Sequence, residues 1–230
     1  MKFRILLAAT LLYASAQPVP AFACSVIDSY RVPTNLELAG NAELIVLGKI
    51  TAGKPMGDGG MDSMAITVQP LSAIKGALPA EPIELKGLAL APARFAVLSN
   101  PYELEAAHPL SYIGGCIRYM FPAGTTALFF LKKRDGQWAP AGGPFSRWAE
   151  DVLDPTGPWP TLTALYVKAA ALTLAERKTL LEAERARYAA MAQDPIAALM
   201  AADISRQLKG PNPTWNKQMD DAMINDGPHR

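Results

Sequence analysis

The chain has few of the residues that usually mark a catalytic or metal site. Its 230 residues include only two histidines, His108 and His229, and only two cysteines, Cys24 and Cys116. It has no HExxH, no GxSxG and no cysteine–histidine cluster, the patterns typical of zinc proteases, serine hydrolases and structural zinc sites. We therefore expect a protein that is not an enzyme, without catalytic residues, metal ligands or a cofactor.

The remaining titratable residues also lack a catalytic context. His108 stands before a proline and no nucleophile elbow is present, so we expect a surface-loop histidine. Glu150 and Asp151 are neighbours whose side chains should point apart, and Asp154 precedes a proline, which together indicate a charged linker. An enzyme with an unrecognised site is an alternative, and a pocket of titratable groups around His108 or Tyr112 would favour it.

A surplus of positive charge is absent as well. The chain has 22 basic and 21 acidic residues, and its first 23 residues carry two of the basic ones and no acidic one, so the net charge changes from +1 to −1 without them. This balance gives no electrostatic basis for binding nucleic acid or an anionic membrane. We accordingly expect five clustered aromatic residues to pack in the core instead of stacking on bases or sugars. They are Phe129, Phe130, Trp138, Phe145 and Trp148.

A long apolar run occurs only at the N-terminus. Lys2 and Arg4 precede an apolar stretch at 5–16 that is short for a bilayer span, and Ala21-Phe22-Ala23 has the small-x-small pattern of a cleavage site. We expect residues 1–23 to be a signal peptide that directs the protein to the periplasm or the medium, with no transmembrane segment in the mature chain. An uncleaved membrane anchor is the alternative.

Cleavage after residue 23 would make Cys24 the first residue of the mature protein. In an exported chain with two cysteines, the simplest arrangement is a Cys24–Cys116 disulfide, and two free thiols are the alternative. Closure of so long a loop stabilises a fold by about 4–5 kcal/mol on the chain-entropy model. Lipidation of Cys24 would instead give a lipid-anchored envelope scaffold, although Ala21 stands where such signals normally have leucine.

Strand-like patterns fill the first half of the chain. Residues 43–50 are a branched apolar run typical of a strand buried on both faces, and Gly48 within it predicts a bulge or bend. Residues 125–131 predict a further strand, and Asp135-Gly136 after it predicts a two-residue hairpin turn. We expect these strands to belong to a β domain over 24–148.

After Pro160 the apolar period becomes helical. Residues 161–172 predict one helix, the capping box from Thr173 to Glu176 begins a second, and Asp194-Pro195 begins a third. The predicted boundaries are a linker over 149–160, a helical appendage over 161–209 and a flexible tail over 210–230 with Trp215 as its only large apolar anchor.

Several segments of the first half appear in the order found in one known family. Cys24 is followed by Ser25, then by NAELIVLGKI at 41–50, SAIKG at 72–76 and GGCIRYMFPAGTTALFFLKKRDGQW at 114–138. Over 24–148 this order resembles the tissue inhibitors of metalloproteinases and the netrin-like domains. The resemblance implies a five-stranded OB-like β-barrel with its first cysteine disulfide-linked into it, and thus an α+β protein with a C-terminal helical appendage.

The resemblance also implies a function. In that family the N-terminal amine and carbonyl of the first cysteine chelate the catalytic zinc of a protease, a role that falls to Cys24 here, with Ser25 directed to the target's specificity pocket. In the simpler alternative, Cys24 only ties the N-terminus to the barrel. We therefore expect an exported, non-enzymatic binding protein that engages a protein partner, with metalloprotease inhibition as the alternative.

Overall fold

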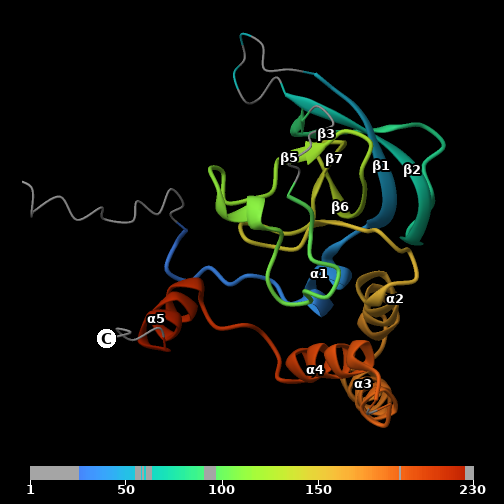
Figure 1. Cartoon of the computed structure of the whole chain (residues 1–230), viewed down its shortest axis with the longest axis vertical. Helices are drawn as coiled ribbons and strands as arrows, with labels where there is room; N and C mark the ends of the chain where they lie inside the picture. The colour runs from blue at the N-terminus through green and yellow to red at the C-terminus, as the bar shows by residue number, and fades with distance from the viewer. Residues whose placement is uncertain are drawn as a thin grey trace, which may run out of the picture.

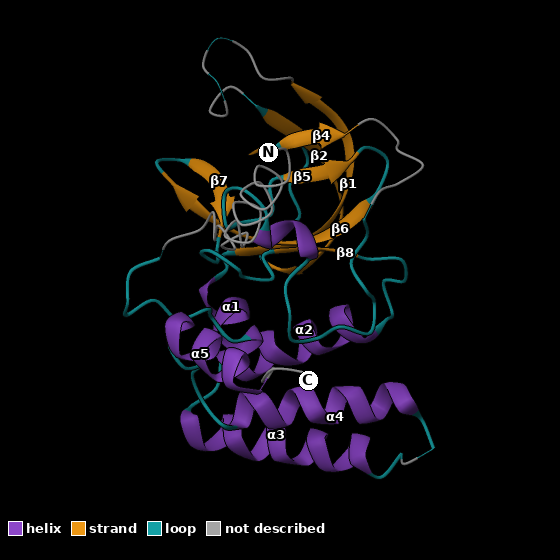
Figure 2. Cartoon of the chain, turned by 60° about the vertical axis from the view of Figure 1, so that its left-hand side comes forward, coloured by secondary structure: helices purple, strands orange, loops and turns teal. Residues whose placement is uncertain are grey.

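The described part of the chain has a mixed α+β fold with a mostly antiparallel sheet and five α-helices. The computed structural model describes residues 26–54, 58, 60, 64–90, 97–191 and 193–225, with the backbone alone for 223–225. The predicted signal peptide and residues Cys24 and Ser25 lie outside the described residues. The sheet lies above helices α1 to α4 in both views (Figures 1 and 2).

Most of the strands form one sheet in the order β3-β2-β1-β6-β7. Both β7 and β8 pair with β6: β7 pairs with its residues 131–134 and β8 with its residues 127–129. The remaining two, β4 and β5, pair with each other in parallel. The strands are β1 (Leu44–Lys54), β2 (Ala65–Lys75), β3 (Ile83–Lys86), β4 (Leu88–Leu90), β5 (Met120–Pro122), β6 (Thr126–Arg134), β7 (Gln137–Pro140) and β8 (Ala149–Asp151).

The sheet does not close into the predicted barrel within the described residues. Its two edge strands, β3 and β7, have Cα atoms within 8 Å of each other, but no ladder of backbone hydrogen bonds joins them. Each strand has only four residues, and β7 ends at Pro140, which lacks the N–H that a ladder needs. The observed architecture is therefore a strongly curved, open sheet.

The local predictions for β1 and for the β6–β7 turn are confirmed. The first five residues of β1 are buried, and the register with β2 shifts at Gly48. A Cβ at Gly48 would stand 2.3 Å from Val68 Cγ1, so only glycine fits there. Asp135 and Gly136 both have positive φ, at 50° and 78°, which fits the type I′ form of the predicted two-residue hairpin turn.

Two hydrophobic cores lie on opposite faces of the sheet because side chains alternate along β1 and β6. Ile45 and Phe130 face the helices, whereas Val46 and Phe129 face the inside of the curved sheet. Phe121 of β5 also belongs to this second core, where its ring contacts those of Phe129 and Trp148. The prediction that the clustered aromatic residues pack in the core is confirmed for Phe129, Phe130, Phe145 and Trp148, which are all buried, and Trp138 is partly buried.

The helices follow the predicted capping signals. Thr173 and Glu176 form the predicted capping box at α3, and the Asp194 side chain caps α4. None of the described helices is long and apolar enough to cross a membrane. The helices are α1 (Asn35–Asn41), α2 (Pro158–Ala170), α3 (Leu174–Ala189), α4 (Pro195–Leu208) and α5 (Trp215–Asn225), and a 3-10 helix, η2, spans Pro109–Tyr112.

Two segments differ from the prediction. The predicted linker at 149–160 begins with β8, whose three residues are all buried, and ends with the first turn of α2. The predicted flexible tail contains α5, which lies apart from α3 and α4 and close to the first described residues (Figure 1). Trp215 N–H donates to Tyr30 O at 2.8 Å, and the Asn212 side chain donates to Val32 O. These bonds hold the start of the tail against an N-terminal segment far away in the sequence.

Candidate functional site

His108 is buried, so the prediction of a surface-loop histidine is wrong. Only 1% of the residue is exposed. Its Nδ1 accepts the N–H of Leu110, which places the ring proton on Nε2. Nε2 lies 3.0 Å from Val97 O and 3.4 Å from Asp151 Oδ2. The histidine side chain therefore links residues 97–108, which precede η2, to Asp151 in β8.

Glu150 and Asp151 are likewise buried in β8, so they do not form the predicted charged linker. The Ser99 hydroxyl donates to Glu150 Oε2 at 2.6 Å and accepts the Asp151 N–H at 2.9 Å. The other Glu150 oxygen accepts the backbone N–H of His108. Although the two carboxylates are sequence neighbours, both contact the segment from Val97 to His108.

Arg118 supplies the positive charge of this cluster. Its Nη2 donates to Asp151 Oδ1 at 2.8 Å and its Nη1 to Ala149 O at 3.1 Å. Burial by itself raises the pKa of Asp151, but the hydrogen bond from His108, the charge and hydrogen bond of Arg118 and the Ser99 N–H outweigh it and hold the pKa below its usual value.

We call Ser99, His108, Arg118, Glu150 and Asp151 the buried polar cluster. All five residues are less than 10% exposed. Their hydrogen bonds are made to one another and to the backbone, which leaves little room for a substrate at His108 or the carboxylates. The cluster brings together titratable groups around His108, but it acts as a structural joint between β8 and residues 97–118.

An open groove lies directly beside this joint, where β8 leads into α2. It has a volume of about 560 Å³. Segments from four parts of the chain form it: the loop at 101–102, residues 151–161, the end of α3 and the start of α4. Its apolar lining includes Pro101, Tyr102, Pro158, Trp159, Tyr188 and Met200.

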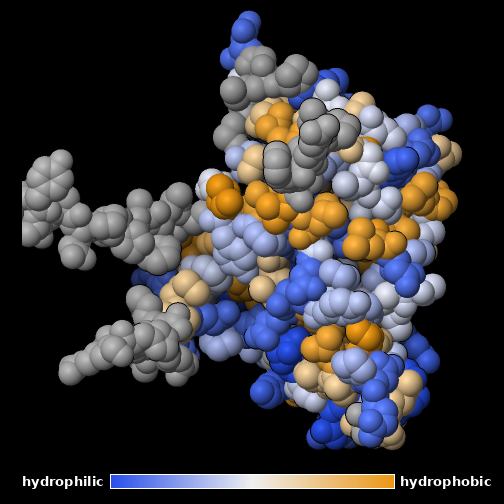
Figure 3. All heavy atoms as spheres, in the orientation of Figure 1, coloured by the Kyte–Doolittle hydropathy of each residue, from blue (hydrophilic) through white to orange (hydrophobic). Residues whose placement is uncertain are grey.

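Two apolar side chains that line this groove are exposed to solvent. Tyr102 is 54% exposed and Leu153 is 69% exposed. Exposed apolar atoms form several patches over both the sheet and the helices on the face seen in Figure 3. Apolar surface that stays in contact with water favours association with a partner.

The charged residues that line the groove are all acidic within the described part of the chain: Asp151, Asp154 and Asp194. Asp154 Oδ1 accepts the N–H and O–H of Thr156, which lowers the pKa of this carboxyl. Asp194 Oδ1 accepts the N–H of Ile196 at the start of α4. The second oxygen of both Asp154 and Asp194 has no partner among the described residues, so each can accept a hydrogen bond from a ligand.

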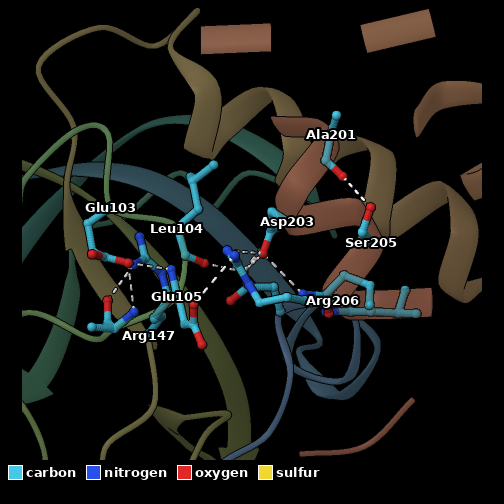
Figure 4. A network of polar contacts seen from close by, with 12 residues as sticks. Glu103, Leu104, Glu105, Arg147, Ala201, Asp203, Ser205 and Arg206 are labelled. Atoms are coloured by element: carbon cyan, nitrogen blue, oxygen red, sulfur yellow. Dashed lines mark hydrogen bonds and ion pairs between the residues drawn. The ribbon is translucent and has the colours of Figure 1, made fainter. Parts of the chain in front are cut away.

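A second polar cluster ties α1, α2 and α4 together around Asp203, which is fully buried. Its carboxylate accepts hydrogen bonds from the Tyr166 hydroxyl and from the side chains of Asn35, Arg206 and Gln207. Burial and then the charge of Asp203 raise the pKa of Tyr166. Figure 4 shows Asp203 and Arg206 on α4, with the segment of Leu104 and Glu105 between them and Arg147.

Of the region around Cys24 and Cys116, to which the family resemblance gives the inhibitory role, only a part is described. No cysteine in the described residues is free, but Cys24 lies outside them, so the Cys24–Cys116 bridge stays a prediction. Cys116 O accepts the N–H of Phe145 at 2.6 Å, and the Tyr30 hydroxyl donates to Pro144 O. Burial raises the pKa of Tyr30 to about 12. Tyr30 and Cys116 therefore both form hydrogen bonds with the loop that contains Pro144 and Phe145.

Comparison with known proteins finds no protein-family model and no curated protein that matches this chain. The described residues also contain no group of three or more His, Cys, Asp or Glu side chains arranged to hold a metal ion.

Proposed function

We propose that this protein is an exported, non-enzymatic binding protein whose groove beside β8 holds an extended segment of a protein partner. The observation that carries the proposal is the groove itself, which combines an apolar and aromatic lining, exposed at Tyr102 and Leu153, with acidic charges only. Proline and aromatic side chains present flat, rigid walls that suit an extended peptide. The acidic residues favour a segment that also carries lysine or arginine.

The proposed domain is an OB-like sheet that resembles the tissue inhibitors of metalloproteinases. Two observations support it: five strands follow one another in a single path, and the edge strands β3 and β7 approach each other. A partly open five-stranded barrel is the usual form of an OB fold. We propose the periplasm or the medium as its location, and mass spectrometry of the mature N-terminus distinguishes cleavage before Cys24 from lipidation and from retention of the leader.

The test uses a short fluorescein-labelled peptide of leucine, proline and lysine and two matched peptides in which glutamine or glutamate replaces lysine. Fluorescence anisotropy should rank the lysine peptide first and the glutamate peptide last. The double variant Asp154→Asn, Asp194→Asn should lose about 2–30-fold in affinity for the lysine peptide, since exposed ion pairs contribute about 0.2–1 kcal/mol each. Asparagine can still cap α4 at 194.

Asp135→Asn is the matched control for the groove experiment. It makes the same kind of substitution and removes one negative charge far from the groove, in the β6–β7 turn, and asparagine suits the positive φ of that position. Its affinity for the lysine peptide should equal that of the parent protein. Equal binding of all three peptides, or an equal loss in the control and the double variant, would rule out recognition by the groove.

A second candidate is a metalloprotease inhibitor that chelates the target's zinc through the amine and carbonyl of Cys24. The anchoring of Tyr30 to Pro144, beside the loop that contacts Cys116, favours it, because a rigid N-terminus loses less entropy on docking. Inhibition of a zinc protease by the mature protein should disappear when one alanine is added before Cys24, whereas peptide binding in the groove should not change.

A further inference from the structure

The guanidinium of Arg147 is buried in the wall of a separate cleft without a carboxylate partner. Only 5% of the residue is exposed. Its Nη1 donates to Ala106 O, its Cζ lies 4.4 Å from the centre of the Trp159 ring, and its Nε has no hydrogen-bond partner. Among the described residues, no Asp or Glu oxygen lies within 4.0 Å of it. A buried cation without an anion is costly, so the site favours an anionic ligand.

The neighbouring carboxylates are already engaged elsewhere. Glu150 accepts from Ser99 and from the His108 N–H. Asp203 pairs with Arg206 on α4, and Glu103 Oε1 accepts the N–H groups of its own loop. Figure 4 shows Glu103 near Arg147, without an ion pair between them, and Asp203 on the far side of the loop.

Arg147 lines a cleft of about 330 Å³ between the N-terminal segment, η2 and the helices α4 and α5. Three aromatic rings also line it. Phe145 and Trp215 stack at 3.8 Å with an interplanar angle of 10°, and Tyr112 lies 5.6 Å from Phe145 at 18°. Tyr112 is 42% exposed. Nearly parallel rings offer a flat apolar surface, which favours a flat ligand.

We propose that this cleft binds a small aromatic carboxylate, with the carboxylate at Arg147 and the ring against Tyr112 and Trp215. The planar guanidinium suits a carboxylate, and charge-assisted hydrogen bonds of this kind are the strong ones. The cleft has the size of the smaller ligand pockets of proteins. It shares no lining residue with the groove beside β8, so this inference goes beyond the proposed function and stands apart from it.

Isothermal titration calorimetry on the full chain tests the proposal with 2-naphthoate, its neutral amide and cyclohexanecarboxylate. We expect 2-naphthoate to bind at least about tenfold more tightly than 2-naphthamide, because the amide lacks the charge. Cyclohexanecarboxylate keeps the charge but lacks the flat ring, so it should also bind more weakly. Absence of 2-naphthoate binding, or equal binding of the acid and the amide, would overturn the proposal.

Arg147→Met separates a ligand site from a structural role. It should weaken 2-naphthoate binding at least about tenfold, yet leave the melting temperature of the free protein at or above that of the parent, because it removes a buried unpaired charge. Lys133→Met, in the β6–β7 hairpin, removes an equal charge and should leave binding unchanged. Trp215→Leu gives an independent test from the aromatic side, should Arg147→Met not fold. Full affinity in Trp215→Leu would contradict the proposed ring position.

Discussion

Asp151 accepts hydrogen bonds from parts of the chain that are far apart in the sequence. Arg118 Nη2 donates to Oδ1, whereas His108 Nε2 and the Ser99 N–H both contact Oδ2, at 3.4 and 2.9 Å. Because the carboxylate and the guanidinium are both buried, each depends on the other for neutralisation. The charge of this one residue therefore holds the segment from Val97 to Arg118 against β8.

We predict that Asp151→Asn destabilises the protein by about 3–5 kcal/mol, because it leaves the Arg118 guanidinium buried without an anion. Urea unfolding followed by tryptophan fluorescence measures the change. Asp154→Asn, three positions along, removes an exposed carboxylate and should change the free energy of unfolding little. Similar losses in the two variants would show that Asp151 has no special structural role.

The same carboxylate predicts a pH dependence of stability. The pKa of Asp151 is lower in the folded protein than in the unfolded chain, where it is about 3.9. The stabilisation is thus complete above that unfolded value and is lost as the pH falls through the folded value. Unfolding free energies of the parent should fall between neutral and acidic pH more steeply than those of Asp151→Asn. Parallel pH curves would contradict the ion pair.

The roles of single residues could be predicted where they depend on neighbours in sequence. Thr173, Asp194 and the Asp135-Gly136 turn act through backbone groups a few positions away, and all were predicted correctly. His108 and Glu150 were assigned to the surface because nothing in their local sequence signals burial. They bond each other across 42 positions of sequence, and a sequence pattern does not reveal such contacts.

At the scale of a single helix, the capping box of α3 gives a clean test. The Thr173 side chain accepts the N–H of Glu176, and the Glu176 carboxylate accepts the N–H and O–H of Thr173. We predict that Thr173→Ala lowers the free energy of unfolding by about 1 kcal/mol, because it leaves N–H groups of the first turn unbonded. Thr173→Ser keeps the hydroxyl, so its free energy of unfolding should lie within a few tenths of a kcal/mol of that of the parent.

A single hydroxyl group, that of Ser99, makes two of the bonds that hold residues 97–112 against β8. Ser99 Oγ bonds both Glu150 and the backbone of Asp151, so Ser99→Ala leaves buried polar groups unpaired. We predict a loss of about 1–3 kcal/mol and faster amide hydrogen exchange in residues 97–112. Ser205→Ala is the matched control, because Ser205 bonds only a carbonyl of its own helix. Unchanged exchange in Ser99→Ala would contradict this account of the loop.

Most of the strands and helices could be predicted from the sequence, but the way in which the segments between them pack could not. Continuous apolar runs mark β1 and β6, and helical patterns mark α3 and α4, because burial on both faces or on one face imposes them. The three residues of β8 are too few to show such a pattern, whereas α5 has a helical one, with Trp215 and Met219 four residues apart, that was missed among the surrounding Pro and Gly residues. β8 exists because Phe129 and Leu128 in β6 offer it an edge, and α5 starts where Trp215 stacks on Phe145.

At the scale of the whole molecule, the helices pack on one face of the sheet and share one of its two cores. Ile45 and Phe130 of the sheet pack with Leu162 of α2 and Ile204 of α4. The groove lies at this junction, because β8 and the helices each supply part of its wall. A site built from several segments has no signature in any one of them, so the sequence indicated a binding protein but not the place where it binds.

The most direct test of the groove is the side-chain N–H signals of the four tryptophans in a nitrogen–proton NMR spectrum during titration with the lysine-containing peptide. Trp159 lines the groove, whereas Trp138, Trp148 and Trp215 do not. We predict that the Trp159 signal shifts progressively and saturates, while the signal of Trp138 in the β6–β7 hairpin stays in place. A saturating titration that leaves Trp159 unmoved would place binding elsewhere and contradict the account.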